Sequence, residues 1–512
     1  MLDSVNTQQP QTAHRSGNPG HNATGNLNPS GVTILRGHVL TPLAQGSAAL
    51  RQGQVRWGEA GGVEIKDIPD GAIAIDTATG TIEAVGDYAS VRAACAEQAT
   101  NQVTVCDHRG CFLLPGFVDC HVHFPQLDMV ASPGEELLGW LNTYTFPAEQ
   151  AYADRAFAEA KADAFADALI AHGVTTASVY ATSHPHSAAA MFRAAQARDM
   201  RVICGKVCMD RNAPEPLLDT PDSAYADSRA LIEAWHGVGR LEYAITPRFA
   251  PTSSLAQLNA LGELAREFPT VVIQTHLAEN RGEVEWVREL YLEAADYTDV
   301  YASRGLVRER SILGHSIYLS PSELQRIVEA GAGLAHCPSS NLFLGSGLFD
   351  ATTAWNAGVR VGLGSDVGAG PSLWAPSVAA DAYKVSRLLG TPVNAGQMLY
   401  LATLAGAEAL GVDAHVGSLE VGKDADVLVV DPAACPALAA RLCGGVSGGA
   451  CSGASGGGVS GGSSEEALFA TFLLADERVL REVWVHGNRR VAWSAGSPTT
   501  LCPTTLCGSG RQ

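Results

Sequence analysis

Apolar and polar positions between residues 113 and 411 repeat with two different spacings. Long segments have the spacing of a helix: "ADRAFAEAKADAFADALIAHG" (153–173) keeps apolar residues on one face and ends at a glycine, which closes a helix at little cost. A second segment, "SPSELQRIVEAG" (320–331), opens with an N-cap serine, a proline at the first helical position and a capping-box glutamate. Both segments are predicted to be helices.

Eight short apolar runs alternate with helical segments. They are apolar on both faces, as the strands of a buried parallel sheet are. Eight such strands alternating with helices predict an α/β fold, a (β/α)₈ or TIM barrel. The runs are "CFLLPGFVDCHVH" (111–123), "VTTASVY" (174–180), "RVICGKVCM" (201–209), "LEYAITPRF" (241–249), "TVVIQTH" (270–276), "SILGHS" (311–316), "AGLAHCP" (332–338) and "VRVGLGSD" (359–366).

β-branched residues broken by Gly, Asp and Pro fill the segments on either side of the barrel, 31–112 and 412–495. Because two β-rich ends flank one barrel, they are expected to join in a small composite β-sandwich domain. The barrel itself is expected to span 113–411 and to carry the metal site. Three further segments are expected to lie outside both domains: a disordered start (1–30), a Gly/Ser-rich loop (about 443–464) and a tail (496–512).

The composition of the 512-residue chain is that of a globular protein, with 46% hydrophobic and 17% charged residues. A formal net charge of −19 argues against nucleic acid and against an anionic membrane as partners, since both attract basic surfaces. No apolar run reaches the roughly 18 residues of a membrane-spanning helix, and the first residues lack the pattern of a secretory signal. The 12 cysteines form no C-x-x-C pair, so we expect reduced thiols and a cytoplasmic location.

Histidines and one aspartate stand where the predicted barrel strands end. His121 and His123 close the first strand, and alternation along a strand points both side chains to the same side. His276 ends the fifth strand, His315 the sixth and Asp366 the eighth. Barrels of this kind carry their chemistry at these C-terminal ends. Four imidazoles and a carboxylate suit Zn²⁺ or Fe²⁺ with an open position for water, although a lone histidine is more often structural.

Three other histidines follow strands without the same support. His184 and His186 repeat the H-x-H spacing in "ATSHPHS", but the proline between them and the small polar neighbours predict a loop rather than a metal site. His336 ends the seventh strand in "AHCPSSN". It is expected at most to line the pocket and not to bind the metal.

The chain resembles the amidohydrolase superfamily, in its ATZ/TRZ-type branch of metal-dependent hydrolases. The resemblance covers about residues 30–495 and rests on "PGFVDCHVH" on the first strand, histidines on the fifth and sixth strands, and "GLGSD" on the eighth. More narrowly, the chain is similar to the guanine deaminases in "HFPQLDMVASPGEELLGWLNTYTFPAE", "GKVCMDRNAPE", "ITPRFAPT", "QTHLAEN" and "GLGSDVGAG". The run through "LNTYTFPAE" is much more specific than H-x-H alone.

The resemblance implies a centre with one metal ion. Its ligands would be His121, His123, His276 and Asp366, which hold one Zn²⁺ per chain, with Fe²⁺ as an alternative that the same ligands accept. Binuclear amidohydrolases usually carry a carboxylated lysine at the end of strand four, and here strand four has no lysine. Because Lys206 lies on strand three, one ion is predicted.

The implied reaction is the hydrolytic deamination of guanine to xanthine and ammonia. A metal-activated water attacks C2 while Asp366 accepts its proton. Glu279, in "HLAEN", protonates ring N3 and then carries a proton to the leaving amine, and His315 stabilises the attacking hydroxide. From the residues alone, Glu279 is equally well explained as an exposed acid at a helix N-terminus.

Substrate contacts are expected beside these residues. Gln126 offers a donor and an acceptor to a purine edge, Arg248 a donor to the purine carbonyl, and Phe249 a ring that packs on the base. A structural ion pair is an alternative role for the arginine. The predicted substrate-binding set is His123, Gln126, Arg248, Phe249, His276, Glu279 and Asp366, and the predicted catalytic set is Glu279, His315 and Asp366.

Two other functions stay open. One is deamination of a different aminated heterocycle, such as a pterin, a triazine, or another purine or pyrimidine, by the same chemistry. The other is a scaffold without catalysis, which the presence of Glu279 and of all five metal-centre positions disfavours. A zinc site of the cytidine-deaminase type is disfavoured because H-x-E followed by P-C-x-x-C is missing. A homodimer is implied by the family resemblance alone.

Overall fold

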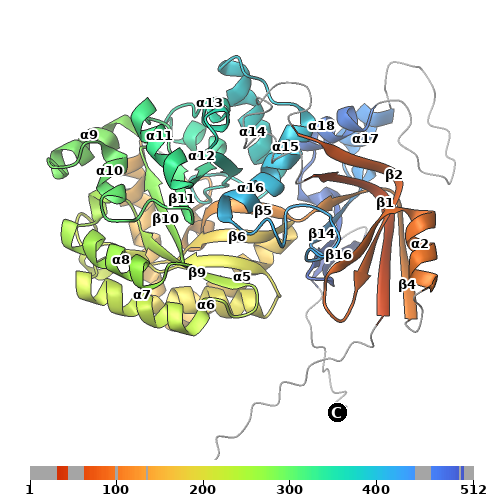
Figure 1. Ribbon diagram of the computed structural model, residues 1–512, viewed down its shortest axis with the longest axis horizontal. Coiled ribbons are helices and arrows are strands. Elements are labelled where there is room, and N and C mark those ends of the chain that lie inside the picture. Colours follow the sequence, from red (N-terminus) through yellow and green to blue (C-terminus); the bar gives the residue numbers. More distant parts are fainter. Residues whose placement is uncertain are drawn as a thin grey trace, which may run out of the picture.

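The computed structural model contains a barrel surrounded by helices and a separate sheet beside it (Figure 1). The residues that the structure describes are 31–43, 63–97, 102–133, 136–443, 463–494 and 497–500. The predicted disordered segment 1–30 lies outside them. Most of the predicted Gly/Ser-rich loop and of the predicted C-terminal tail also lie outside the described residues.

Parallel strands of the central segment form the predicted barrel. In the described part of the chain, eight strands pair in chain order. The last returns to the first, since the N–H of Asp366 donates to the carbonyl of His121 (2.8 Å) and that of His123 to the carbonyl of Val367 (2.9 Å). The barrel prediction is therefore confirmed. The strands are β5 (Phe117–His123), β6 (Val174–Tyr180), β7 (Arg201–Gly205), β9 (Leu241–Pro247), β10 (Val272–Leu277), β11 (Ser311–His315), β12 (Gly333–His336) and β13 (Arg360–Leu363), and the short β8 (Val207–Cys208) pairs with β9.

Helices between the strands cover the outside of the barrel (Figure 1). The two helices predicted above are confirmed: Asp154 caps the start of α5, and Ser320 and Glu323 form the capping box of α11. No described helix is both long and apolar enough to cross a membrane. The helices are α5 (Arg155–Ala171), α6 (Pro185–Gln196), α7 (Pro221–Trp235), α8 (Leu255–Glu267), α9 (Arg281–Leu290), α10 (Tyr297–Ala302), α11 (Pro321–Ala330), α12 (Pro338–Phe343), α13 (Ala351–Asn356), α14 (Ala375–Leu388), α15 (Ala395–Ala402) and α16 (Leu404–Leu410).

The second H-x-H pair begins a helix, so the prediction of a loop there is wrong. His184 is the N-cap of α6, and Pro185 is its first residue, because the fixed φ of proline suits that position. The rings of His184 and His186 stack with 5.6 Å between centroids. A ring nitrogen of His186 bonds the carbonyl of Tyr152 (2.8 Å).

A series of short helices follows β5 and lies over the C-terminal ends of the strands. Its apolar side chains, Trp140 and Phe146 among them, share a buried cluster with Tyr180, Phe249 and Leu344 from other strand ends and loops. The segment therefore forms one wall of the barrel mouth. Its helices are η1 (Phe124–Met129), α3 (Leu137–Trp140), η2 (Leu141–Thr145), α4 (Phe146–Gln150) and η3 (Ala151–Ala153).

Strands of both flanks combine in one β domain, as predicted. Hydrogen bonds link the eight described strands of this domain into one continuous sheet, in the order β17-β16-β15-β14-β4-β1-β2-β3. The flanks meet where β4 pairs antiparallel with β14, and β17 falls within the predicted tail. The elements are β1 (Gly31–Pro42), β2 (Ile65–Asp76), β3 (Ile82–Asp87), α2 (Tyr88–Glu97), β4 (Gln102–Pro115), β14 (Val427–Val430), η6 (Pro432–Ala434), α17 (Pro436–Cys443), α18 (Ser464–Leu474), η7 (Glu477–Val479), β15 (Leu480–Val485), β16 (Asn488–Ser494) and β17 (Ser497–Thr500), with η4 (Glu215–Leu217) and η5 (Ala250–Thr252) in barrel loops.

Candidate active site

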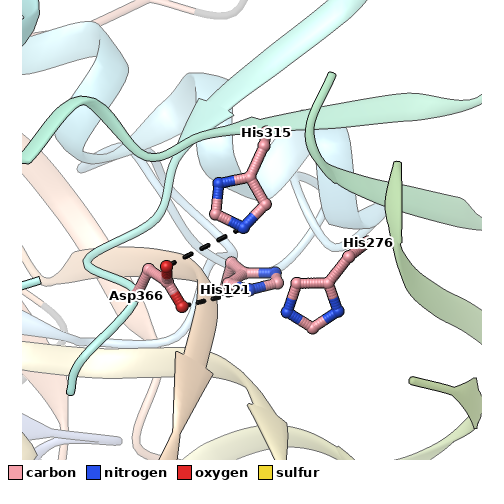
Figure 2. A group of neighbouring side chains, drawn as sticks. All are labelled: His121, His276, His315 and Asp366. Atoms are coloured by element: carbon pink, nitrogen blue, oxygen red, sulfur yellow. Dashed lines mark ion pairs between the residues drawn. The ribbon is translucent and has the colours of Figure 1, made fainter. Parts of the chain in front are cut away.

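The barrel brings together all five residues that its strand ends were predicted to supply. His121 and His123 lie at the end of β5, His276 in β10, His315 at the end of β11, and Asp366 after β13. Figure 2 shows four of these side chains gathered around one centre. The group is largely shielded from water, since Asp366 is only 5% exposed and His121 only 1%.

Four of the side chains have the spacing of ligands around one ion. Nε2 of His121 lies 3.3 Å from Nε2 of His123, and each of these atoms lies 3.3 Å from Oδ1 of Asp366. Nε2 of His276 lies 3.2 Å from Nε2 of His123. With metal–nitrogen bonds of about 2.0–2.1 Å, the ligand atoms of a tetrahedral zinc site lie about 3.4 Å apart. The predicted ligand set therefore fits a single ion.

His315 is a possible replacement for His123 in this set. Ligand atoms of His121, His276, His315 and Asp366 all lie within 4.8 Å of one another. However, Nε2 of His315 is 3.8 Å from Oδ2 of Asp366, which is longer than the contacts of His123. The shorter contacts favour His123 as the ligand.

Hydrogen bonds orient two of the imidazoles. Nδ1 of His276 lies 2.7 Å from the carbonyl oxygen of Arg248, and Nδ1 of His315 lies 2.8 Å from Oδ1 of Asn341. Because both oxygens only accept hydrogen bonds, each Nδ1 carries the hydrogen. His276 therefore presents the lone pair of Nε2 to the centre, as metal-binding histidines do when a backbone carbonyl holds the other nitrogen.

The protonation states of the cluster are those that bind a cation. Burial lowers the pKa of His121 to about 4, and it also lowers the pKa values of His123 and His276. Burial alone would raise the pKa of Asp366, but hydrogen bonds with His121 and His123 bring it well below its usual value. Near neutral pH the three imidazoles are neutral and the carboxylate is ionised, which are the forms that coordinate a metal.

The pKa of His315 moves in the opposite direction. Burial lowers it, but the nearby carboxylates of Glu279 and Asp366 outweigh burial and raise it. Nε2 of His315 lies 3.5 Å from Oε2 of Glu279 and has no hydrogen-bond partner among the described residues. A ring that holds its proton more firmly suits a hydrogen-bond donor better than a metal ligand.

The turn that carries Asp366 is tied to the first barrel strand. The buried carboxylate of Asp119, in β5, accepts hydrogen bonds from the N–H of His121 (3.1 Å), the N–H of Ser365 (3.0 Å) and the Ser365 hydroxyl. Burial raises the pKa of Asp119 to about 6. Asp366 itself has a φ of +48°, and His315 one of +63°, values that few non-glycine residues adopt. Two residues of the site, Asp366 and His315, thus have unusual backbone conformations.

Glu279 is part of the site and not an exposed acid, so the alternative reading of this residue is wrong. It follows β10 and is 2% exposed. Its Oε1 accepts a hydrogen bond from the Ser346 hydroxyl at 3.0 Å, and burial raises its pKa to about 7. The helix-capping role belongs to its neighbours, since Asn280 and Glu283 form the capping box of α9.

All seven predicted substrate-binding residues line one cavity. The cavity opens beside the predicted metal ligands, and its other walls are mainly apolar. The lining residues are His123, Gln126, Leu137, Trp140, Leu141, Arg248, Phe249, His276, Glu279, His315, Leu344, Asp366 and Ala369.

The structure shows the ion pair considered for Arg248, and it also places this residue where the predicted contact with a substrate could form. It lines the cavity, and its Nη1 also donates to both carboxylate oxygens of Glu149, each at 2.8 Å. Glu149 was not predicted from the sequence. It lies at the end of a specific run, "LNTYTFPAE", but nothing in the spacing of that run indicates a partner 99 residues away.

Three residues that support the predicted catalytic side chains follow β12 and were not predicted from the sequence. Ser340 donates to Oδ2 of Asp366 (2.6 Å), Asn341 accepts from His315, and Ser346 donates to Glu279. A signal was available for Ser340 and Asn341, because "PSSN" (338–341) begins two residues after the end of a barrel strand, on the face that carries the chemistry in such barrels, whereas nothing in the sequence indicated Ser346. His336, on the same strand, is buried against Phe349 and does not line the cavity, so its expected role there is not found.

Comparisons with known proteins agree with this site. The profile of the amidohydrolase family matches residues 112–490. The guanine deaminase of Escherichia coli (strain K12) is 41% identical over 424 residues, which cover 83% of this chain and 92% of that relative. A solved structure of E. coli guanine deaminase matches with a TM-score of 0.80 at 38% identity, over 89% of this chain and 99% of that chain. A structure of guanine deaminase from C. acetobutylicum with guanine bound in the active site matches with a TM-score of 0.74 at 26% identity, over 90% of this chain and 99% of that chain.

Proposed function

The chain belongs to the amidohydrolase family, and from that premise we propose that it is a guanine deaminase, which hydrolyses guanine to xanthine and ammonia. The observation that carries the proposal is the position of Glu279, a buried carboxyl group beside the metal ligands in a cavity that also presents Arg248 and Gln126. The relatives that carry the name guanine deaminase, one of them with guanine bound, support the same substrate.

The proposed cofactor is one Zn²⁺ per chain, with Fe²⁺ as the alternative. His121, His123, His276 and Asp366 would hold it through the contacts described above. Such an ion supplies a water molecule that is acidic enough to act as a nucleophile at neutral pH. We propose no second ion, because β9 contains no lysine and the ammonium group of Lys206 pairs with Asp219 (2.6 Å).

Three side chains would hold or move protons during attack at C2. The ionised Asp366 accepts the proton of the attacking water. Glu279 donates its proton to ring N3, passes to the leaving amine the proton that Asp366 took from the water, and regains a proton from the C2 hydroxyl as the carbonyl of xanthine forms. A pKa near 7 suits a group that gives and regains protons at neutral pH. His315 donates a hydrogen bond to the attacking oxygen and so stabilises the charge that develops on it.

Substrate recognition would use the opposite side of the cavity. Arg248 and Gln126 donate hydrogen bonds to the carbonyl edge of the purine, while Phe249 packs against its flat face. Trp140 and Leu344 contribute apolar walls that exclude water from the reacting atoms.

Turnover of the purified full chain on guanine tests the proposal, with xanthine and ammonia as the measured products. A panel of other amines (a pterin, a triazine, adenine and cytosine) is assayed beside it. We expect guanine to have the highest kcat/KM of the panel. A higher kcat/KM for another amine would establish the second candidate, deamination of a different heterocycle, and no turnover of any of them would indicate a scaffold without catalysis.

The pH profile should show that Glu279 acts as an acid. Burial raises its pKa to about 7, so the carboxyl group is protonated below this pH and loses its proton above it. We therefore expect kcat/KM to decline as the pH rises through about 7, measured under metal-saturated conditions. In Glu279→Gln the residual activity should lack this decline. If the variant keeps it at the same pH, another group is responsible.

We further propose a cytoplasmic location and a homodimer. Eight cysteines whose side chains the structure describes are free thiols, as in reducing compartments. The homodimer rests on the family resemblance. The proposed domain limits are 113–411 for the barrel and 31–112 with 412–495 for the β domain. The pairing of β4 with β14 supports one domain from both flanks, while β4 extends to Pro115 and β17 lies beyond residue 495.

A further inference from the structure

A buried carboxylate outside the predicted site contacts both side chains that are expected to recognise the purine edge. Glu149 lies in α4 and is 0% exposed. Both of its oxygens accept from Nη1 of Arg248 at 2.8 Å, and Oε1 also accepts from Nε2 of Gln126 at 3.3 Å. Arg248 and Gln126 line the cavity, whereas Glu149 stands behind them. It can therefore act on a substrate only through these two residues.

The helix that carries Glu149 holds the arginine in a second way. Phe146 and Glu149 are three positions apart in α4, so they lie on the same side of the helix. The ring of Phe146 lies 5.6 Å from the guanidinium carbon of Arg248, a distance at which a cation and an aromatic face attract each other. Phe146 and Glu149, both in the run "TFPAE" (145–149), therefore contact Arg248 together.

Glu149 also determines which way the amide of Gln126 faces. An ionised carboxylate only accepts hydrogen bonds, so the amide nitrogen and not the amide oxygen must face it. On its other side, Oε1 of Gln126 accepts from the N–H of Gly368 at 3.3 Å. The amide oxygen is thus occupied by the backbone, and the amide nitrogen keeps one further N–H group. Arg248 has only donors.

We propose that Glu149 is a positioning residue that makes this edge of the cavity a donor-only surface, which selects a 6-oxopurine over a 6-aminopurine. The inference rests on the proposed function. The carbonyl oxygen at C6 of a 6-oxopurine can accept hydrogen bonds from both Arg248 and Gln126. An amino group at C6 is itself a hydrogen-bond donor, so it faces the donors of Arg248 and Gln126 and leaves these buried N–H groups without an acceptor. Burying an unpaired donor makes the binding free energy less favourable.

Kinetics with two substrates test the role of Glu149. Guanine and 2,6-diaminopurine carry the same 2-amino leaving group and differ at C6, so they separate recognition from chemistry. In the full-length, metal-loaded Glu149→Gln variant, the new amide can donate as well as accept and no longer orients Gln126. We expect KM for guanine to rise about ten-fold and the kcat/KM preference for guanine over 2,6-diaminopurine to fall about ten-fold, while kcat changes less. Metal content should equal that of the wild type.

Glu482→Gln is the matched control. Glu482 is a buried carboxylate of the β domain that pairs with Arg489 (3.1 Å), so this variant also removes one charge from an ion pair, far from the cavity. We expect its KM and its substrate preference to match the wild type. A folded, metal-loaded Glu149→Gln with an unchanged preference, or with equal losses on both substrates, would overturn the inference.

A second variant covers the case in which Glu149→Gln does not fold. Glu149→Asp keeps the charge but shortens the side chain, so it should lower the preference for guanine by a smaller factor, and an unchanged preference again overturns the inference. A wild-type protein that leaves guanine intact overturns the proposed function and this inference with it. Wild-type turnover of guanine combined with variants of unchanged preference overturns this inference alone.

Discussion

Replacing Glu279 by glutamine is expected to lower kcat on guanine about a thousand-fold while the protein keeps its metal. Glutamine has nearly the same shape and can still accept the hydrogen bond from Ser346. It cannot donate a proton to the ring and regain it. Because Glu279 contacts His315 and not the four proposed metal ligands, metal content measured on the purified variant should stay at the wild-type value.

The same substitution should leave the fold intact. Burial raises the pKa of Glu279, which means that the folded state disfavours its ionised form. The folded-state pKa lies above the unfolded value, so ionisation of this group lowers stability as the pH rises toward and through 7. A neutral glutamine avoids this effect, and Tm measured above pH 7 should be no lower than in the wild type. Glu323→Gln, at a buried capping glutamate of α11, is the control and should keep full turnover. Turnover of Glu279→Gln close to the wild type would remove the proton-transfer role.

Replacing His123 by alanine is expected to abolish metal binding and turnover together. Nε2 of His123 lies within 3.3 Å of ligand atoms from His121, His276 and Asp366, so its loss opens the centre of the cluster. Loss of an outer-shell partner costs roughly 10–100-fold in metal affinity, and loss of a direct ligand should cost more. Without the ion, the pKa of water returns from about 7 to about 16, so turnover should fall by more than about ten-thousand-fold.

His315→Ala separates the two possible ligand sets. If His315 acts as a hydrogen-bond donor, its alanine variant should retain about one metal ion per chain and lose roughly 100–1,000-fold in kcat, as happens when one donor to a developing oxyanion is removed. Metal analysis of both variants after dialysis decides between the sets. Retention of metal in His123→Ala together with its loss in His315→Ala would show that the ligand set is His121, His276, His315 and Asp366.

Much of the site could be predicted from the sequence because the C-terminal ends of all barrel strands lie at one mouth. A residue at the C-terminal end of any barrel strand reaches the same mouth, so His121, His276 and Asp366 could be placed together without knowing a single distance. The second H-x-H pair shows where this reasoning stops. His184 and His186 also follow a strand, but Pro185 starts a helix there, and the two rings stack on each other instead of facing the cavity.

The supporting contacts could not be read in this way. Glu149 and Arg248 are 99 residues apart, and their ion pair exists only because the short helices after β5 fold over the barrel mouth. The left-handed backbone of His315 and of Asp366 likewise depends on the surrounding structure, since Asp and His adopt that conformation more often than most residues but still only in a small minority of cases. Local sequence carries no record of such long-range contacts.

The sequence by itself determined the barrel, the joining of both flanks in a β domain, and the residues that meet at the strand ends. These features follow from patterns within single segments: the period of apolar positions, helix caps, and the alternation of side chains along a strand. The tertiary structure alone decided the burial of Glu279, which raises its pKa to about 7. It also decided that His123 lies closer than His315 to Asp366. The hydrogen bonds from Arg248 and Gln126 to Glu149 are likewise set only by the tertiary structure. Burial and hydrogen bonding are properties of packed neighbours, and here those neighbours come from distant parts of the chain.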